Sequence, residues 1–593
     1  MTYRAPIKEM LFVMEELAGL SSVAALPGFE DYGSETAQAV LEESAKFCES
    51  VIAPLNWEGD KNPSTWQHGV VTTTPGFKAA FTQFAQGGWQ GVSHPIEFGG
   101  QGFPKLVATG CTEMLHAANM SFALCPMLTD GAIEALLTAA NPQLRQMFAP
   151  KLISGQWTGT MNLTEPQAGS DLAAVRTRAD PQSDGTYKIF GTKIYITYGE
   201  HDMAENIIHL VLARVAGAPE GVKGISLFVV PKFMVNGNGA LGARNDVVCV
   251  SIEHKLGIKA SPTAVLQFGD HGGAMGYLVG DENRGLEYMF IMMNAARFAV
   301  GMQGVAISDR AYQKAVVFAN DRAQSRDLAG SPGPVAIIQH PDVKRMLLTM
   351  RAYTEGARAL AYMAAAASDA AHASPDADTS KQNQSVYEYL VPVVKGFSTE
   401  MSIEVASLGV QVHGGMGFIE ETGAAQYFRD ARILTIYEGT TAIQANDFVG
   451  RKTLRDGGAV ARAICAQIAV TEQDLAAHTE EDCAVMRRAL EAGRHALEST
   501  IDYVVTNAKT DTKAVYAGAV NYLMLAGVVL CGWQMARAMM VALCKQETDL
   551  LFYEAKVATA RFYAEAILPK ADALAASVVD SGRTVNRMSA EMF

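Results

Sequence analysis

The sequence predicts an α+β protein of several domains: an N-terminal helical domain, a middle antiparallel β domain, a C-terminal four-helix bundle and an extra C-terminal helical domain. The chain has 593 residues, of which 49% are hydrophobic and 19% charged, so it can bury more than one core. Helical periodicity dominates the first part of the chain, short β-type runs follow, and helical periodicity then returns. These changes of pattern place the domains at residues 1–160, 161–280, 281–457 and 458–593.

In the N-terminal domain, Thr36–Val51 and Lys105–Asn119 have the periodicity of helices. The middle domain contains short runs rich in β-branched and aromatic residues, mostly bounded by glycine, proline or aspartate, which predict strands. These runs are Tyr187–Phe190, Lys193–Thr197, Asn206–Val215, Gly224–Pro231, Val247–Glu253 and Ala264–Phe268. Gly237–Gly242 matches the dinucleotide fingerprint GxGxxG, but a strand-like run follows it instead of a helix. We therefore interpret it as a hairpin connection and exclude a Rossmann fold.

Helical patterns return in the third domain, over Leu286–Asp321, His340–Ala370, Gln384–Val410 and Thr441–Leu454. The segment Ala364–Asn383 is rich in alanine, serine and aspartate, and this composition is typical of a helix end followed by an exposed loop. The third domain is therefore expected to be all-helical.

Residues after Gly458 form a further helical block that contains one proline, Pro569. Within it, Ala514–Ala536 carries no charge over a length that could span a bilayer. Asn521, Gln534 and several glycines interrupt its apolar character, which favours a buried core helix over a membrane contact. We therefore expect no integral membrane span.

Charge and cysteine usage restrict the class of protein. The formal net charge is −14 and there is no Lys/Arg run, so nucleic acid is not an expected partner. The eight cysteines are scattered without a CxxC pair, which indicates reduced, buried thiols in an intracellular protein and predicts no metal site. The N-terminal segment has a glutamate pair where a secretory signal would be apolar, and it lacks an Arg/Ser-rich transit pattern. We expect a cytoplasmic protein.

The segment Met161–Leu172, MNLTEPQAGSDL, has an unusual composition. An apolar lead-in is followed by Thr164 and Glu165, a proline turn, and small residues that include Gly169 and Ser170. Small side chains allow backbone N–H groups and short hydroxyls to come close to a flat or anionic ligand. The segment therefore indicates a ligand-binding loop.

A second segment, Gly191–Thr197 (GTKIYIT), follows the first loop along the chain. Side chains two positions apart on a strand share a face, so Tyr195 and Thr197 offer an aromatic ring and a hydroxyl on one side. This pair suits a planar heterocycle that needs stacking and a hydrogen bond. Taken in isolation, the pattern favours a cross-strand packing pair, whereas its position after the first loop favours ligand binding.

The third segment, Gln411–Phe418 (QVHGGMGF), contains three glycines. Glycines allow a second chain or a cofactor to approach the backbone closely, so Gly414 and Gly415 are candidate contacts. We interpret His413 as a packing residue, because no second ligand at metal spacing accompanies it.

The fourth segment, Ile433–Thr441 (ILTIYEGTT), contains Glu438 as an isolated acid among apolar residues, and Gly439 leaves space beside it. Desolvation raises the pKa of such a carboxyl group and makes it a competent base once a substrate closes the site. An alternative of equal weight is a glutamate that caps the following helix. The residues alone do not separate these two roles.

Taken together, the order and spacing of the four segments resemble the acyl-CoA dehydrogenase family over about residues 40–455. The resemblance implies an FAD-dependent enzyme with Glu438 as the catalytic base, because IYEGT is where most members of the family keep their glutamate. Some members place the base at the position of Ala296, which cannot serve here.

The resemblance also implies the remaining site residues. The residues implied to bind FAD are Met161, Leu163, Thr164, Gly169, Ser170, Tyr195, Thr197, Arg322, Gln411, Gly414, Gly415 and Thr440. The residues implied to bind substrate are Ser170, Asn294, Arg297, Glu438 and Gly439. For Arg297, a salt bridge on a helix surface is the alternative. Arg322 is implied to reach the FAD pyrophosphate across a subunit interface.

The chain departs from the usual family pattern at four positions. Tyr195 replaces a tryptophan, Ser325 a phenylalanine, Gln426 a basic residue and Ala442 a glutamine. The change at Ser325 leaves the placement of Arg322 open, and the change at Ala442 leaves one cofactor contact open.

The implied activity is the α,β-dehydrogenation of an acyl-CoA thioester to a trans-2-enoyl-CoA, with electrons passed to an electron-transferring flavoprotein. The resemblance further implies a homodimer and a role in fatty acid metabolism. The segment Gly199–Phe233 resembles the long bacterial members with a C-terminal extension, so 3-(methylthio)propanoyl-CoA joins short- and medium-chain acyl-CoA as a candidate substrate. Met127 or Leu128 could shorten the acyl pocket. The alternatives are an acyl-CoA oxidase that uses O₂ and a non-catalytic FAD-binding scaffold.

Overall fold

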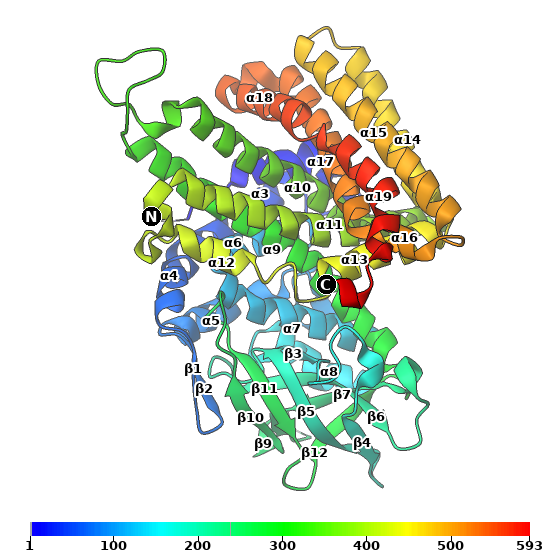
Figure 1. Cartoon of the computed structure of the whole chain (residues 1–593). Coiled ribbons are helices and arrows are strands. Elements are labelled where there is room, and N and C mark those ends of the chain that lie inside the picture. Colours follow the sequence, from blue (N-terminus) through cyan, green and yellow to red (C-terminus); the bar gives the residue numbers. More distant parts are fainter. Residues whose placement is uncertain (1–2, 238) are drawn as a thin grey trace.

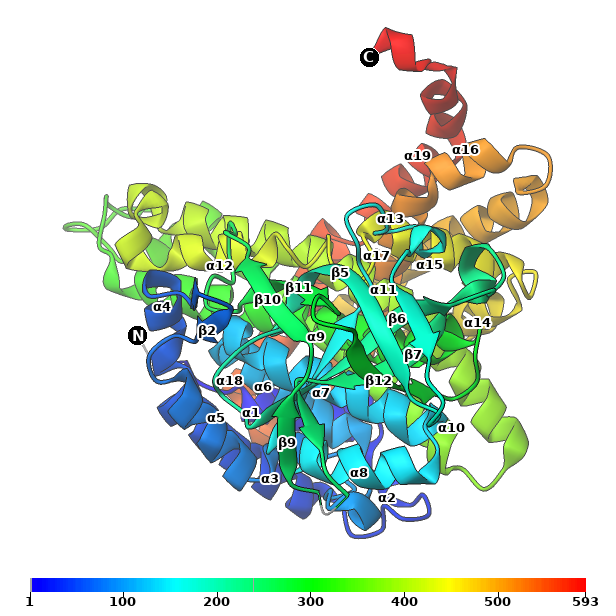
Figure 2. The ribbon, with the colours of Figure 1, turned by 90° about the horizontal axis from the view of Figure 1, so that it is seen from below.

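The computed structural model describes residues 3–237 and 239–593, and helical and β regions follow one another along the chain (Figure 1). The β domain lies at one end of the molecule and the last helices at the other, with the remaining helices between them. Seen from below, the strands lie in front of the helices (Figure 2).

Helices and a short hairpin make up the N-terminal region. The helices are α1 (Ile7–Phe12), α2 (Leu20–Ala24), α3 (Ser34–Phe47), α4 (Pro54–Lys61), α5 (Phe77–Gln86), α6 (Lys105–Ala118), α7 (Met120–Ala139) and α8 (Pro142–Ile153), and the hairpin pairs β1 (Thr65–Gln67) with β2 (Val70–Thr72). Helix α7 is capped at its N-terminus by Asn119, whose side chain accepts a hydrogen bond from Phe122 N at 3.1 Å. It is buried on almost all sides and packs against both β3 and the long helix α9, so it lies between the β domain and the bundle.

The middle domain is built on one sheet. Its strands are β3 (Trp157–Asn162), β4 (Arg178–Pro181), β5 (Tyr187–Thr197), β6 (Asn206–Val215), β7 (Ser226–Pro231), β10 (Val247–Ile252), β11 (Thr263–Phe268) and β12 (Ala274–Val279). They lie in the order β10-β11-β5-β12-β7-β6-β3, and β4 pairs with both β5 and β6. The pairing is mostly antiparallel, as predicted, but β6 runs parallel to β3 and to β4.

A separate hairpin carries the GxGxxG match. It pairs β8 (Phe233–Val235) with β9 (Leu241–Arg244) in antiparallel fashion, and β10 follows instead of a helix. The interpretation as a hairpin connection agrees with this arrangement, although Asn238 within the match lies outside the described residues.

The third region is helical. Its helices are α9 (Gly285–Asp321), α10 (Pro341–Ala373), α11 (Ala377–Val412), α12 (Ala424–Ala431) and α13 (Thr441–Asp447), and the three long ones pack on one another. The prediction of an exposed loop within Ala364–Asn383 is mostly wrong, because only Ser374–Asp376 lies outside helices. The alanines at the end of α10 are largely buried, and the side chain of Asp376 caps α11 by accepting a hydrogen bond from Thr379 N at 2.9 Å.

The C-terminal extension contains α14 (Ala459–Ala476), α15 (Glu481–Asn507), α16 (Thr512–Ala517), α17 (Ala519–Lys545), α18 (Leu550–Ala566) and α19 (Lys570–Arg587). Helix α17 is its buried centre and packs on α10 and α11 of the bundle. All eight cysteines are free thiols, and seven are buried as expected. Cys544, near the end of α17, is exposed and departs from that expectation.

Three stretches of the described chain are long and apolar enough to cross a membrane when judged by length and composition alone. They are α7, α9 and Ala519–Thr548, and 83%, 67% and 72% of their most apolar windows are buried inside the protein. This burial favours core helices, and the absence of an integral span stays a prediction.

Candidate active site

The first loop, Met161–Leu172, is anchored by the buried carboxylate of Glu165. This carboxylate accepts hydrogen bonds from Thr177 N at 3.0 Å, Thr177 Oγ1 at 2.6 Å and Lys193 Nζ at 2.8 Å. Burial raises the pKa of Glu165, but the Lys193 ammonium and these hydrogen bonds outweigh burial and lower it to about 2. Lys193 Nζ also donates to Leu163 O at 3.0 Å, so the loop is fixed to β5.

The loop presents its small residues to solvent and keeps its apolar start inside. Met161 is buried, Leu163 and Thr164 are half-buried, and Gly169 and Ser170 are exposed. A Cβ atom at Gly169 would meet nothing within 4 Å. The loop therefore has room for a ligand at this point.

Strand β5 carries a bulge at Tyr195. Ile194 and Tyr195 of β5 oppose the single residue Val265 of β11. Tyr195 has a φ of 60° and is 61% exposed, because the extra residue turns the ring away from the buried face of the sheet. Ile194 N donates to Thr164 O at 2.9 Å, so the bulge also ties β5 to the first loop. Thr197, two residues beyond the ring, is half-buried.

Glu438 lies in the loop between α12 and α13, where two consecutive residues have a left-handed backbone. The φ angle is 53° at Glu438 and 87° at Gly439. The cap of α13 is Thr440, whose Oγ1 accepts a hydrogen bond from Ile443 N at 3.3 Å, so Glu438 does not cap that helix. Within residues 3–237 and 239–593, no side chain makes a hydrogen bond or ion pair to the Glu438 carboxyl group.

Two fully buried side chains hold this loop from the protein interior. Lys395 Nζ on α11 donates to Leu434 O and to Gly439 O, both at 2.8 Å. Gln444 Nε2 on α13 donates to Glu438 O at 3.2 Å and to Gly439 O at 3.3 Å. These contacts satisfy the carbonyl groups of the left-handed segment and stabilise its conformation.

The electrostatics of the loop bring Glu438 into the range of a base. Burial raises the pKa of Glu438 to about 7, while the positive charges of Lys395 and Arg297 act in the opposite direction. Burial likewise lowers the pKa of Lys395 to about 7, and the nearby Glu438 opposes that change. A carboxyl group with this pKa exchanges its proton near neutral pH, as general acid–base chemistry requires.

Arg297 is buried within α9 and is not on a helix surface. Its Nη1 lies 3.2 Å from Asp447 Oδ2 on α13. Burial lowers the pKa of Arg297, and Asp447 and Glu438 both act in the opposite direction. The surface salt bridge considered from the sequence is therefore wrong, since a buried ion pair takes its place. Asn294, one turn earlier, is exposed.

Helix α7 supports the site from two sides. Tyr198 at the end of β5 donates its hydroxyl to Ser121 O at 2.7 Å. From the bundle, Tyr437 donates its hydroxyl to the side chain of Gln303, whose Nε2 donates to Met127 Sδ at 3.3 Å. The β5 end and the loop that carries the isolated glutamate thus meet the same helix.

Met127 also borders a cavity of about 50 Å³ in the N-terminal region. The cavity is lined mainly by apolar side chains of the neighbouring helices, among them Phe84, Cys111 and Leu115. Met127 therefore lines this cavity and contacts Gln303, which accepts a hydrogen bond from Tyr437 in the loop of Glu438.

The remaining residues implied to bind FAD gather at the ends of α9 and α11. They are Arg322, Gln411, Gly414 and Gly415, all of them exposed. The ring of Phe318 stacks on that of His413 with centroids 4.3 Å apart, which holds the two helix ends together. His413 Nδ1 also lies 2.7 Å from Gly409 O, in agreement with a packing role. Among the described residues, no hydrogen bond, ion pair or ring contact joins these helix ends to Glu438.

These surfaces fit FAD. An aromatic ring that is 61% exposed on a bulged strand, with a half-buried hydroxyl two residues away, suits the flat face of a flavin. Tyr195 and Thr197 would hold that ring, and the open loop around Gly169 would meet it. A Cβ atom added at Gly414 or at Gly415 would have no neighbouring atom within 4 Å, so another chain or a cofactor can approach these two residues.

Sequence reasoning missed Lys395, Gln444 and Gln303. Lys395 on α11 and Gln303 on α9 are distant from the loop of Glu438 in the sequence, whereas Gln444 lies on α13, the helix that directly follows the loop. A lysine within an apolar helical run was the one available signal, because lysine is rarely buried without a specific role.

Four family models match successive parts of the chain. The models of the acyl-CoA dehydrogenase N-terminal, middle and C-terminal domains match residues 34–156, 160–271 and 283–452. A fourth model, described as acetyl-CoA dehydrogenase C-terminal like, matches residues 462–589 in the extension.

Two relatives extend the similarity over nearly the whole chain. The 3-methylmercaptopropionyl-CoA dehydrogenase of Ruegeria pomeroyi is 51% identical over 98% of this chain and 99% of its own length. The broad-specificity linear acyl-CoA dehydrogenase FadE5 of Mycobacterium tuberculosis is 35% identical over 96% of each chain.

Solved structures share the architecture. Caenorhabditis elegans ACDH-11 in complex with C11-CoA has a TM-score of 0.74 at 19% identity, covering 96% of this chain and 92% of its own. An acyl-CoA dehydrogenase complexed with FAD from Bacillus anthracis has a TM-score of 0.74 at 20% identity, covering 95% and 92%. At these identities the likeness establishes a common fold that includes the extension.

Proposed function

The chain belongs to the acyl-CoA dehydrogenase family, which makes it an FAD-dependent oxidoreductase of acyl-CoA thioesters, and we propose that Glu438 is its catalytic base. The observation that carries the proposal is the state of this carboxyl group. It is half-buried, it has no hydrogen-bond partner among the described residues, and its pKa is raised to about 7. A group in this state is poised to take a proton from carbon once a substrate excludes water.

In the proposed reaction, Glu438 removes a proton from the α carbon of the thioester, a hydride leaves the β carbon, and a trans double bond forms between them. Bound FAD supplies the hydride acceptor. Lys395 and Gln444 hold the backbone of Glu438, so the carboxyl group keeps one orientation. The positive charges of Lys395 and Arg297 favour the ionised carboxylate that accepts the proton.

We propose that the substrate is a short acyl-CoA, with 3-(methylthio)propanoyl-CoA as the favoured one. The relative from Ruegeria pomeroyi, at 51% identity over nearly the full chain, carries that substrate in its name. The Tyr437–Gln303–Met127 chain of contacts supports a short acyl group, because it fills the region between the loop of Glu438 and the lining of the neighbouring cavity with side chains. The thioether of Met127 is also a polarizable group that suits contact with the sulfur of the substrate.

We also propose a cytoplasmic homodimer that serves acyl-CoA degradation and passes electrons to an electron-transferring flavoprotein. An apolar patch next to Gly414 and Gly415 supports the dimer: Met416, Phe418 and Ile419 are 51%, 87% and 45% exposed. Exposed apolar residues gathered in this way are typical of a protein interface. Family membership supports the flavoprotein acceptor.

The substrate proposal is tested by anaerobic bleaching of the flavin with a set of thioesters. Pentanoyl-CoA is the matched control for 3-(methylthio)propanoyl-CoA, because a CH₂ group replaces the sulfur. We expect both to bleach the flavin, the thioether to have the higher kcat/KM, and a long-chain thioester to react poorly. A preference for long chains would contradict the substrate class, and failure of every thioester would contradict catalysis. Hydrogen peroxide formed in air at the rate of turnover would identify an oxidase.

A further inference from the structure

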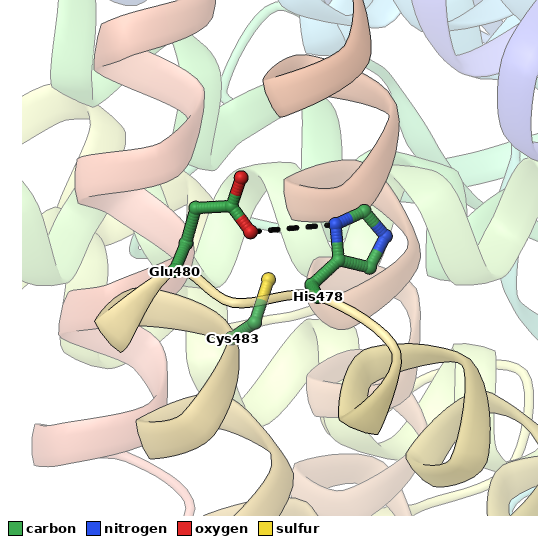
Figure 3. Close-up of side chains that lie close together, drawn as sticks. All are labelled: His478, Glu480 and Cys483. Carbon is green, nitrogen blue, oxygen red and sulfur yellow. Dashed lines mark ion pairs between the residues drawn. The ribbon is translucent and has the colours of Figure 1, made fainter.

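The turn between α14 and α15 brings three metal-ligating side chains together in the extension. His478 and Glu480 lie in the turn, and Cys483 lies in the first turn of α15. Figure 3 shows the imidazole, the carboxylate and the thiol converging on one region. His478 Nδ1 is 3.6 Å from Glu480 Oε2, and the three ligand atoms all lie within 4.8 Å of one another.

The charges around the turn leave Glu480 available to a cation. Arg561 of α18 donates to Asp482 at 2.8 Å and to Glu481 at 3.2 Å, so the two neighbouring acids already have a cationic partner. Glu480 pairs with His478, and its side chain has no other ion pair within the described part of the chain. An added positive charge would therefore meet a carboxylate that lacks a permanent counterion.

The sulfur is held in place beneath these two groups. The Cys483 side chain is fully buried, whereas the side chains of His478 and Glu480 are 26% and 44% exposed. Burial, then the charges of Glu480 and Asp482 and the thiol of Cys544, raises the pKa of Cys483 to about 11. A metal ion binds the thiolate form of cysteine, so binding at this position releases the thiol proton.

The mixture of donors selects the class of ion. An imidazole nitrogen, a carboxylate oxygen and a thiolate suit Zn²⁺ and related borderline ions, whereas Mg²⁺ and Ca²⁺ prefer oxygen ligands alone. At metal–ligand distances of about 2.0–2.3 Å, neighbouring ligand atoms of a tetrahedral ion lie roughly 3.3–3.8 Å apart. The His478–Glu480 separation already fits, and small rotations of these two partly exposed side chains bring both closer to Cys483.

We propose that this turn binds one divalent ion of the zinc class through His478 Nδ1, a Glu480 oxygen and Cys483 Sγ. Binding forms three metal–ligand bonds and releases the thiol proton to solvent, without a change in the oxidation state of the ion. The ion fixes the end of α14 to the start of α15 and takes no part in the dehydrogenation. The cluster depends on how the turn folds, which is why cysteine spacing alone predicted no metal site.

The test uses the full-length flavoprotein after treatment with a chelator, titrated separately with Co²⁺ and Zn²⁺. We expect one tightly bound ion per chain and intense ligand-field absorption of four-coordinate cobalt at wavelengths beyond the flavin bands. We also expect a Zn²⁺-dependent rise in Tm, and tighter binding at higher pH because a proton is released.

Substitutions of the proposed ligands distinguish binding at this site from non-specific metal binding elsewhere on the protein. Cys483→Ser and His478→Gln should lose the cobalt spectrum and the Zn²⁺-dependent rise in Tm, while their flavin content and turnover report that they fold. Cys465→Ser, which removes a buried thiol of α14, is the matched control and should keep both signals. The proposal is overturned if the wild type retains no ion, or if Cys483→Ser keeps the cobalt spectrum.

Discussion

At the scale of single residues, Glu438 combines a left-handed backbone with a half-buried carboxyl group, and both features lower stability in favour of function. Its pKa of about 7 lies above its ordinary value, so the fold favours the protonated form. The protonated form of Glu438 therefore contributes to the free energy of unfolding. This contribution is fully present at pH values below the ordinary pKa of a glutamate, and it is lost as the pH rises through about 7.

Replacement of Glu438 by glutamine should therefore separate catalysis from stability. We expect Glu438→Gln to keep its flavin and to lose about 10²–10⁴ in turnover, the range supplied by a general base. The free energy of unfolding of the variant minus that of the wild type should rise by about 2 kcal/mol from pH 5 to pH 8, because glutamine cannot ionise. Stopped-flow reduction and urea unfolding at the two pH values check this. Normal turnover would remove Glu438 from the role of base.

Lys395 offers a second test, because its charge faces Glu438. In Lys395→Met the loss of the cation should raise the pKa of Glu438 and move the acidic limb of the kcat/KM profile to higher pH, by about one unit. Arg297 and Glu400 also act on this pair and remain in the variant. Lys395→Gln keeps a hydrogen-bond donor without the charge and should move the limb in the same direction.

The matched control is Lys556→Met, which removes another buried lysine, on α18, that pairs with Glu9 and Glu355. This variant should lose stability without moving the acidic limb. If Lys395→Met lowers the rate equally at every pH and leaves the limb in place, the lysine is structural only.

The residues that contact the loop of Glu438 from distant parts of the chain could not be identified from the sequence. Glu438 was a candidate because an acid stood alone in an apolar run before a glycine, and the family resemblance then favoured the role of base over that of a helix cap. Lys395 and Gln303, which contact its loop at Gly439 and Tyr437, lie on other helices, so their relation to the loop exists only after the bundle is packed. Thr440 caps α13 through its hydroxyl, and its expected contact with FAD stays a prediction.

At the scale of elements, periodicity was a good guide to the long helices and a poor one to short or irregular strands. The expected Leu286–Asp321 and the observed α9 differ by one residue at their start. By contrast, β3, β4 and β12 were not among the predicted strands. The composition of β4 and β12 includes charged, proline or glycine residues that weaken the strand pattern. The bulge at Tyr195 depends on the register between β5 and β11, which spacing within one strand does not contain.

Helix α7 gives a prediction for acyl-chain length. Met127→Ala removes the side chain between the Gln303 contact and the 50 Å³ cavity, so the acyl pocket should extend into that cavity. We expect the ratio of kcat/KM for a medium-chain over a short-chain thioester to rise about tenfold, within the range for one or two methylene groups. Leu128→Ala, at a buried neighbour that does not line the cavity, is the control. An unchanged ratio in Met127→Ala would place the chain-length limit elsewhere.

At the scale of the whole molecule, the extension reaches the active site through α17. Gly396, next to Lys395 on α11, faces α17 so closely that an added Cβ atom would lie 2.4 Å from Leu523. Gly527 of α17 faces α11 in the same way, and a Cβ atom there would lie 2.2 Å from the Phe397 side chain. Through α17 the extension therefore packs against α11, the helix whose Lys395 holds the loop of Glu438. The sequence predicted the extension as a helical block, but this contact between small residues required the packed structure.

A single methyl group at Gly527 should test that connection. Helix propensity alone would favour alanine by about 1 kcal/mol, but the contact lies at the base of the Phe397 ring, where no flexible chain end can move aside. We therefore expect Gly527→Ala to lower the free energy of unfolding by about 1–3 kcal/mol and to displace α11. The control is Gly493→Ala on α15, whose nearest contact is the Val529 Cγ2 methyl group at 3.3 Å, and it should be close to neutral.

Because Phe397 lies near Lys395 on α11, the pH dependence of kcat/KM should change in Gly527→Ala together with Tm. A fall in Tm with an unchanged pH profile would mean that the extension stabilises the chain without supporting the catalytic loop.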